Sequence, residues 1–226
     1  MTDNPSVPLW RQAITDSNHP LNKAAWIVFS EKMKPEFADK QLADQKEQVI
    51  PFLYEIIDTP ALLDDTSLGS GNVPINAVEL LGQWKVADAV PRLIKILEDN
   101  DWDKTIHDSA ITALEEIGAP TVEPLLAFAK SRTDEGDQIS LAATLSDIGR
   151  RDPNVFAFAT SLFEKRKPDD EQDIRFLAES ILVCDHEQGI PYLQEKLKHG
   201  RYSKKLRQTL ERYIEASAKK EFASLE

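Results

Sequence analysis

The segment Ala89-Val90-Pro91-Arg92-Leu93 recurs along this chain with small changes. Its other copies are Val49-Ile50-Pro51-Phe52-Leu53, Val122-Glu123-Pro124-Leu125-Leu126 and Gly189-Ile190-Pro191-Tyr192-Leu193. Successive prolines are 40, 33 and 67 residues apart, and the last gap leaves room for one more unit at Asn154-Val155-Phe156-Ala157-Phe158. A period in the thirties to forties, with two apolar helices in each unit, predicts stacked helical hairpins.

The unit around Pro91 shows how each hairpin is expected to form. Val90, Leu93, Ile94 and Leu97 follow the i, i+3, i+4, i+7 spacing of one apolar helix face. Proline suits the first turn of this second, or B, helix, because the first-turn amides have no intrahelical acceptor. The preceding A helix is expected over 75–81, with Gly82 as its C-terminal stop.

This pattern predicts an all-α fold, an α-α superhelix or solenoid of about five to six helical hairpins. We expect one domain over residues 1–226. Residues 1–45 would form a degenerate N-terminal unit, residues 46–200 the clear repeats, and residues 201–226 a C-terminal capping helix.

Composition narrows the classes of partner. The net charge of −12 repels phosphate backbones, so we expect no nucleic acid as the main ligand. The single cysteine, Cys184, lies in an apolar run and is expected to be buried and inert. The N-terminal residues show no signal-like pattern and no run reaches the length of a membrane span, so we expect a cytoplasmic protein with no membrane partner.

The B-helix prolines and the Ala-x-x-x-Leu-x-x-Ile-Gly pattern of residues 110–118 resemble short bacterial HEAT-like repeats of the phycobilisome-lyase type. The resemblance covers about residues 45–200 and includes the segment 71–82. It implies a protein-binding scaffold, with a bilin lyase-like enzyme or enzyme subunit as the alternative. HEAT-like DNA glycosylases are a further alternative, which the acidic composition disfavours.

Aligning the units on their B helices predicts a binding surface. In each unit, the residue directly before the large apolar core residue of the B helix and the residue three positions later lie on one stripe of that helix. In HEAT-like solenoids this B-helix side usually lines the concave face, so the stripe is our candidate surface for a protein or peptide. Its members are Phe52, Glu55, Arg92, Lys95, Leu125, Phe128, Tyr192 and Glu195. The competing interpretation is that these side chains only pack between neighbouring repeats.

The sequence contains no recognisable catalytic, metal or cofactor motif. Residues 99–103 begin like a calcium loop, but Lys104 and Ala110 occupy the positions of the turn glycine and the bidentate glutamate. We expect these residues instead to lead into a helix capped by Asp103 or Thr105. The four histidines lie in different units, so no pair has metal-ligand spacing. We therefore expect a non-enzymatic protein without metal or cofactor, and its oligomeric state is left open.

Overall fold

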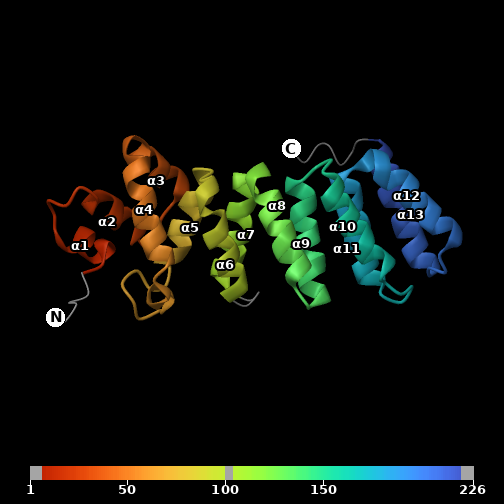
Figure 1. Cartoon of the computed structure of the whole chain (residues 1–226), viewed down its shortest axis with the longest axis horizontal. Helices are drawn as coiled ribbons and strands as arrows, with labels where there is room; N and C mark the ends of the chain where they lie inside the picture. The colour runs from red at the N-terminus through yellow and green to blue at the C-terminus, as the bar shows by residue number, and fades with distance from the viewer. Residues whose placement is uncertain (1–6, 100–103, 220–226) are drawn as a thin grey trace. The chain divides into compact units, whose positions relative to one another are not determined.

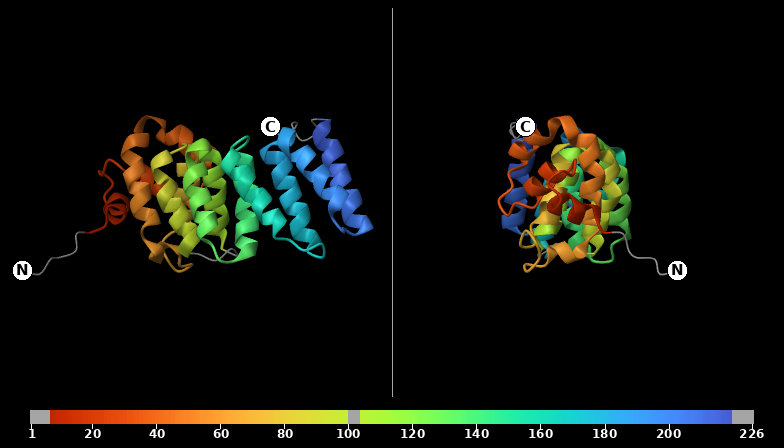
Figure 2. Two further views of the ribbon diagram at one scale, coloured as in Figure 1. Left: turned by 45° about the vertical axis from the view of Figure 1, so that its right-hand side comes forward. Right: turned by 90° about the vertical axis from the view of Figure 1, so that its left-hand side faces the viewer.

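A computed structural model describes residues 7–99 and 104–219 of the chain. Within these ranges all regular structure is helical and there is no strand (Figures 1 and 2). The all-α prediction is confirmed. Contacts divide the chain into two compact units, residues 1–117 and residues 118–226, which are described separately below. The expectation of a single domain stays a prediction.

The described residues of unit 1 form seven α-helices. They are α1 (Leu9–Thr15), α2 (Asn22–Val28), α3 (Pro35–Leu42), α4 (Lys46–Ile57), α5 (Val73–Gln83), α6 (Val90–Asp99) and α7 (Thr105–Ile117), with short 3-10 turns at 43–45, 60–63 and 87–89. Helix α5 is central to the unit, because it packs against α3, α4 and α7, while α6 packs on α7. The repeat region of this unit therefore has the expected A-helix to A-helix stacking.

The contact between α5 and α7 depends on Gly82. We expected this glycine to end the A helix, and that expectation is wrong, because α5 continues to Gln83. Gly82 is buried, and a Cβ added to it would lie 2.6 Å from the Cα of Ala113 and 2.7 Å from a carboxylate oxygen of Glu116 on α7. The glycine is thus required for close approach of two helices. In α7, by contrast, the helix does end before Gly118, which has a positive φ of 79°.

The N-terminal part of unit 1 lies where the sequence predicts a degenerate repeat unit. Helix α2 ends at Val28, and α3 follows over Pro35–Leu42 in a largely polar stretch of the sequence. Asn76 on α5 ties this region down: its side-chain amide donates to the carbonyls of Val28 (2.7 Å) and Ser30 (2.9 Å). These bonds satisfy buried carbonyl groups at the end of α2.

The described residues of unit 2, up to 219, form six α-helices after a short 3-10 turn at 119–121. They are α8 (Val122–Ser131), α9 (Glu135–Ile148), α10 (Pro153–Glu164), α11 (Glu171–Cys184), α12 (His186–His199) and α13 (Lys204–Ala218). The A helices α9 and α11 pack on one another, α10 packs against both of them, and α13 covers α11 and α12. Helix α13 lies within the 201–226 range where a capping helix is expected, and residues 220–226 lie outside the described residues. Its role as a cap stays a prediction.

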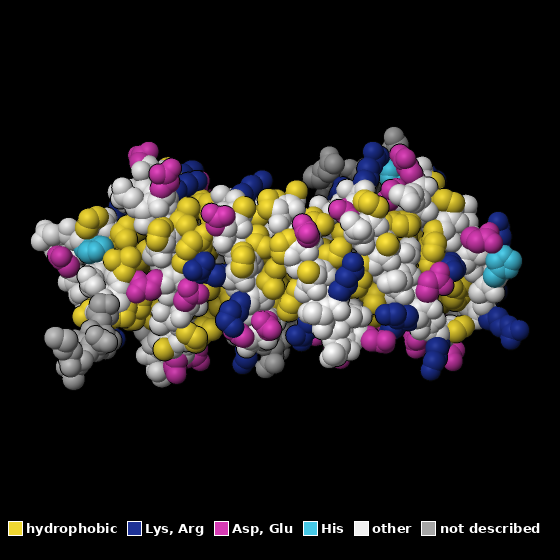
Figure 3. Space-filling view, viewed as in Figure 1, with side chains coloured by type: hydrophobic (Ala, Val, Ile, Leu, Met, Phe, Trp, Pro, Cys, Tyr) yellow, Lys and Arg dark blue, Asp and Glu magenta, His cyan; other side chains and the backbone are white. Residues whose placement is uncertain are grey.

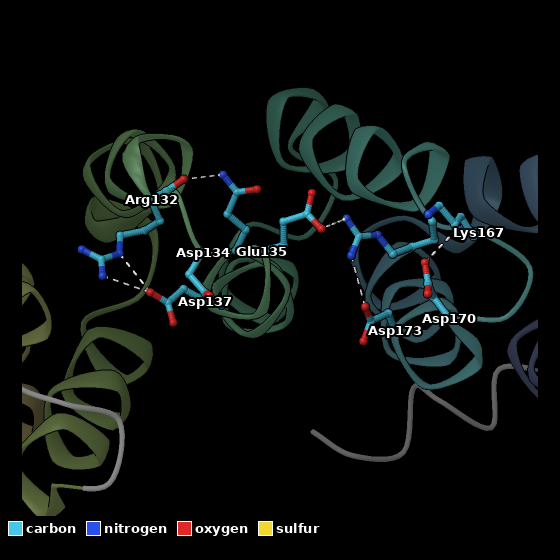
Figure 4. A network of polar contacts seen from close by, with 9 residues as sticks. Arg132, Asp134, Glu135, Asp137, Lys167, Asp170 and Asp173 are labelled. Carbon is cyan, nitrogen blue, oxygen red and sulfur yellow. Dashed lines mark hydrogen bonds and ion pairs between the residues drawn. The ribbon is translucent and has the colours of Figure 1, made fainter.

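Charged residues near the start of α9 and α11 hold the A helices of unit 2 in place (Figure 4). The side chain of Arg166 is only 6% exposed. Its guanidinium pairs with Glu135 of α9 at 2.6 Å and with Asp173 of α11 at 3.2 Å. Asp134 caps α9 by accepting from the Asp137 amide at 3.0 Å. Because a largely buried guanidinium without its carboxylates is costly, this network fixes how the two helix starts meet.

Candidate protein-binding surface

Two of the expected surface residues belong to the core. Phe52 of α4 and Leu125 of α8 have 0% exposed surface. The prediction that these two side chains anchor a partner is therefore wrong. The reason is helix rotation: in α4 and α8 the core includes the residue directly after the proline, whereas in α6 and α12 that residue, Arg92 or Tyr192, is half-exposed. One residue corresponds to about 100° of rotation, so a common proline register does not give a common exposed stripe.

Arg92 in unit 1 links two B helices. Its guanidinium carbon lies 4.3 Å from the ring centre of Tyr54 on α4, and its Nε donates to the carboxylate of Asp58 at 3.2 Å. Burial, together with the negative charge of Asp88, raises the pKa of Tyr54 above its usual value. The side chain of Arg92 remains 38% exposed, so its outer edge can still contact a partner while its inner side packs between hairpins.

Glu55 and Lys95 have different surroundings. The carboxylate of Glu55 accepts from the backbone amides of Leu9 (2.8 Å) and Trp10 (3.2 Å), the first two amides of α1. Glu55 thus supplies the N-terminal cap that α1 lacks in its own sequence. Lys95 is exposed and pairs with Asp99 one turn along α6 at 2.8 Å, which leaves it available on the surface.

Tyr192 in unit 2 forms a cluster between α10 and α12. Its ring meets Phe156 and Phe163 edge-on, with centroids 6.3 and 5.9 Å away, and its hydroxyl donates to Glu164 at 2.9 Å. Lys196 Nζ lies 5.2 Å from the ring centre and also pairs with Glu164. Burial and the Glu164 carboxylate raise the pKa of Tyr192, so the phenol stays neutral. These contacts hold the ring in place, and the residue remains half-exposed.

Phe128 and Glu195 complete the surface of unit 2. Phe128 of α8 is half-buried, with the guanidinium carbon of Arg132 5.4 Å from its ring centre. Arg132 is itself fixed by Asp137 of α9 at 3.0 Å (Figure 4). Glu195 is exposed and contacts Lys198 (3.1 Å) and His199 (2.9 Å) of its own helix. Lys198 in particular lowers the pKa of Glu195.

The structure adds exposed apolar side chains that the repeat alignment did not select. They are Val7 (53% exposed), Trp26 (62%), Phe37 (57%), Leu68 (53%) and Phe176 (51%). None of them lies on a B helix, which is why an analysis of the B-helix columns missed them. Hydrophobic side chains lying among charges of both signs are visible on one face of the chain in Figure 3. Aromatic residues with lysines three positions away in the sequence are the signal that could have found Trp26 and Phe37.

The potential reactive groups are placed as follows. Cys184 is 1% exposed, and burial above all raises the pKa of its thiol to about 11. Residues 100–103 of the suggested calcium-like segment, including the capping candidate Asp103, lie outside the described residues, and Thr105 is the first residue of α7 rather than its cap. In the described ranges there is no group of three or more His, Cys, Asp or Glu residues arranged to hold a metal ion. None of the described helices is both long and apolar enough to cross a membrane.

Comparison with known proteins agrees with the stacked hairpins. Residues 59–146 match the family of HEAT repeats. The matched range supports a HEAT-like repeat protein. It begins before α5 and ends within α9, so it includes the A helices α5 and α7. No match was found among the curated proteins or among the solved structures.

Proposed function

We propose that this protein is a non-enzymatic scaffold that binds a protein or peptide through the B helices of its HEAT-like hairpins. HEAT repeats commonly mediate protein interactions, and the match over residues 59–146 supports that class of function. The single observation that carries the proposal is a pair of half-exposed aromatic side chains, Phe128 and Tyr192, with a cation 5.4 and 5.2 Å from their ring centres. Aromatic residues and arginine are enriched in protein interfaces.

Rigidity is the physical reason for this choice. Tyr192 is fixed by Phe156, Phe163 and Glu164, so it loses little rotamer freedom when a partner binds. In unit 1 the corresponding candidates are Arg92 and the exposed Lys95. Each unit would therefore offer its own contacts, with Glu195 as an exposed charge at the edge of the unit 2 surface.

A pull-down with the Phe128→Ser variant tests the proposal. We expect a clearly weaker interaction with the native partners, because the half-exposed ring is lost, and a melting temperature near that of the wild type. The matched control is Phe176→Ser, which removes an exposed ring from the A helix α11 and should leave the interaction unchanged. Partners retained equally by the two variants would contradict the B-helix surface. A large fall in the melting temperature of Phe128→Ser would instead assign Phe128 to the core.

A bacterial origin, similarity to the phycobilisome-lyase type and a cytoplasmic location are part of the same proposal and rest on the sequence alone. The identity of the protein partner is decided by affinity purification followed by mass spectrometry. A coloured adduct formed from bilin and apoprotein would replace the scaffold with the lyase-like alternative. A DNA mobility shift at physiological ionic strength would replace it with the nucleic-acid alternative.

A further inference from the structure

The two most exposed aromatic side chains of the described residues lie on consecutive helices of unit 1. Trp26 of α2 is 62% exposed and Phe37 of α3 is 57% exposed. The inward sides of these helices carry small or aliphatic residues, namely Ala24, Ala25 and Val28 on α2 and Ala38 and Leu42 on α3, all fully buried. The largest apolar side chain of each helix therefore faces solvent while smaller ones form the core. Two large exposed rings on neighbouring helices mark a candidate interaction surface.

Each ring has exposed lysines one turn away. Lys23 precedes Trp26 by three residues on α2, while Lys34 and Lys40 flank Phe37 by three residues on either side. Residues three apart on a helix are neighbours, so both helices carry a stripe in which an aromatic ring alternates with positive charge. We call the surface formed by Lys23, Trp26, Lys34, Phe37 and Lys40 the Trp26/Phe37 face.

Among the described residues Lys23, Lys34 and Lys40 form no ion pair, although the charge of Lys40 contributes to the lowered pKa of Asp39. Asp39 pairs with Lys46 at 2.6 Å, and this hydrogen bond is the main reason that the pKa of Asp39 is lowered. Glu31 accepts a hydrogen bond from the hydroxyl of Ser70 at 2.9 Å, while Glu36 is exposed. Residues 22–42 thus carry four lysines against three carboxylates, one of which is paired with Lys46, in a chain whose net charge is −12.

The two stripes lie on neighbouring helices of one hairpin. Helices α2 and α3 contact each other, and Lys23 Nζ donates to the carbonyl of Gln41 at 2.7 Å. Since this bond joins the start of α2 to the end of α3, the helices run in opposite directions. Asn76 and the contacts of α5 with both helices hold the hairpin against the repeats. The rings are therefore presented on a fixed support.

We propose that the Trp26/Phe37 face docks an acidic amphipathic segment of a partner protein, whose large apolar side chains cover the two rings and whose carboxylates meet the lysines. The surface is separate from the B-helix surface and does not depend on it. Charge complementarity selects the partner: a basic segment would be repelled by Lys23, Lys34 and Lys40, and a purely apolar one would leave them unpaired. Exposed aromatic and lysine residues also occur at lipid interfaces. An anionic bilayer is the weaker candidate, because an extended negative plane would also face the acidic remainder of the chain.

The test uses the full chain and a display library of random peptides roughly four helical turns long. Peptides are selected on the wild type and their affinities are measured by fluorescence anisotropy. The variants are Trp26→Ser/Phe37→Ser and Lys34→Glu/Lys40→Glu, with Phe176→Ser as the matched control for loss of an exposed ring. Vesicles of phosphatidylcholine mixed with phosphatidylserine form a separate arm of the experiment.

We expect the selected peptides to be rich in Asp and Glu together with Leu, Phe or Trp. The Trp26→Ser/Phe37→Ser variant should weaken their binding by about thirtyfold, and Lys34→Glu/Lys40→Glu by about tenfold. The Phe176→Ser control should bind as the wild type does, and all variants should melt near the wild-type temperature. The proposal would be overturned if the selected peptides were basic or uncharged. It would also be overturned if their binding did not depend on Trp26 and Phe37. Binding to vesicles without binding to acidic peptides would assign the surface to a lipid instead.

Discussion

Replacing Gly82 with alanine tests the central packing contact of unit 1. In an isolated helix this change would be favourable by about 1 kcal/mol, because alanine has the higher helix propensity. In α5 the added Cβ would lie 2.6 Å from the Cα of Ala113, 2.7 Å from a Glu116 carboxylate oxygen and 2.8 Å from the Ala113 Cβ. The carboxylate can turn away, but a backbone atom moves only if α5 and α7 separate. Such overpacking costs about 3 kcal/mol or slightly more.

The two effects predict a net loss of about 2 kcal/mol in the free energy of unfolding for Gly82→Ala. This corresponds to a fall of roughly 5 °C in melting temperature. Guanidinium unfolding followed by far-ultraviolet circular dichroism measures the loss. Gly136→Ala in the first turn of α9 is the matched control, since Gly136 is exposed and its added Cβ would approach no atom of a neighbouring helix, only the Asp134 Oδ1 at 3.0 Å. A Gly82→Ala protein as stable as the wild type would refute the close-packing argument.

Three further predictions concern buried groups. Leu93→Asp places a charge at a position with 0% exposure; we expect the hairpins of unit 1 to lose helical circular dichroism together, and a melt like that of the wild type would contradict the core placement. The thiol of Cys184, whose pKa burial raises to about 11, should react with a disulfide reagent at pH ~8 only after unfolding; reaction of the folded chain at the unfolded rate would contradict this. Burial raises the pKa of Glu79, with smaller contributions from Glu116 and Glu36, so its ionised form destabilises the fold at neutral pH. Glu79→Gln should therefore raise the melting temperature at pH ~7, and this gain should shrink toward pH ~4 as the wild-type carboxyl becomes protonated; a gain independent of pH would rule out this explanation.

The sequence was sufficient for the helices of the clear repeats, and less so for how they face one another. Proline phrases and apolar spacing correctly predicted the B helices, since Pro91 and Pro124 fall in the first turns of α6 and α8. In α4 and α12, however, Pro51 and Pro191 lie further inside helices that begin at Lys46 and His186. A shift of helix start changes neither composition nor period, so sequence alone could not reveal it.

The candidate surface suffered from the same limit. Side-chain exposure depends on rotation about the helix axis, and tertiary packing sets that rotation. Phe52 and Tyr192 have equivalent positions after a proline, yet the first is core and the second is half-exposed. Long-range partners were also beyond reach: no local pattern indicates that Glu55 caps α1 across 45 residues or more. The role of Gly82 depends on α7 and was equally hidden.

The amide of Asn76 has a consequence for the assembly of the N-terminal region. An aliphatic side chain in its place could slide along α2 with little change in energy, because dispersion contacts are not directional. An amide that must meet the Val28 and Ser30 carbonyls at 2.7 and 2.9 Å has only one acceptable alignment. Asn76 therefore fixes the position of α2 relative to α5. An apolar side chain at this site could bury more hydrophobic surface, but it would not select one alignment of the two helices.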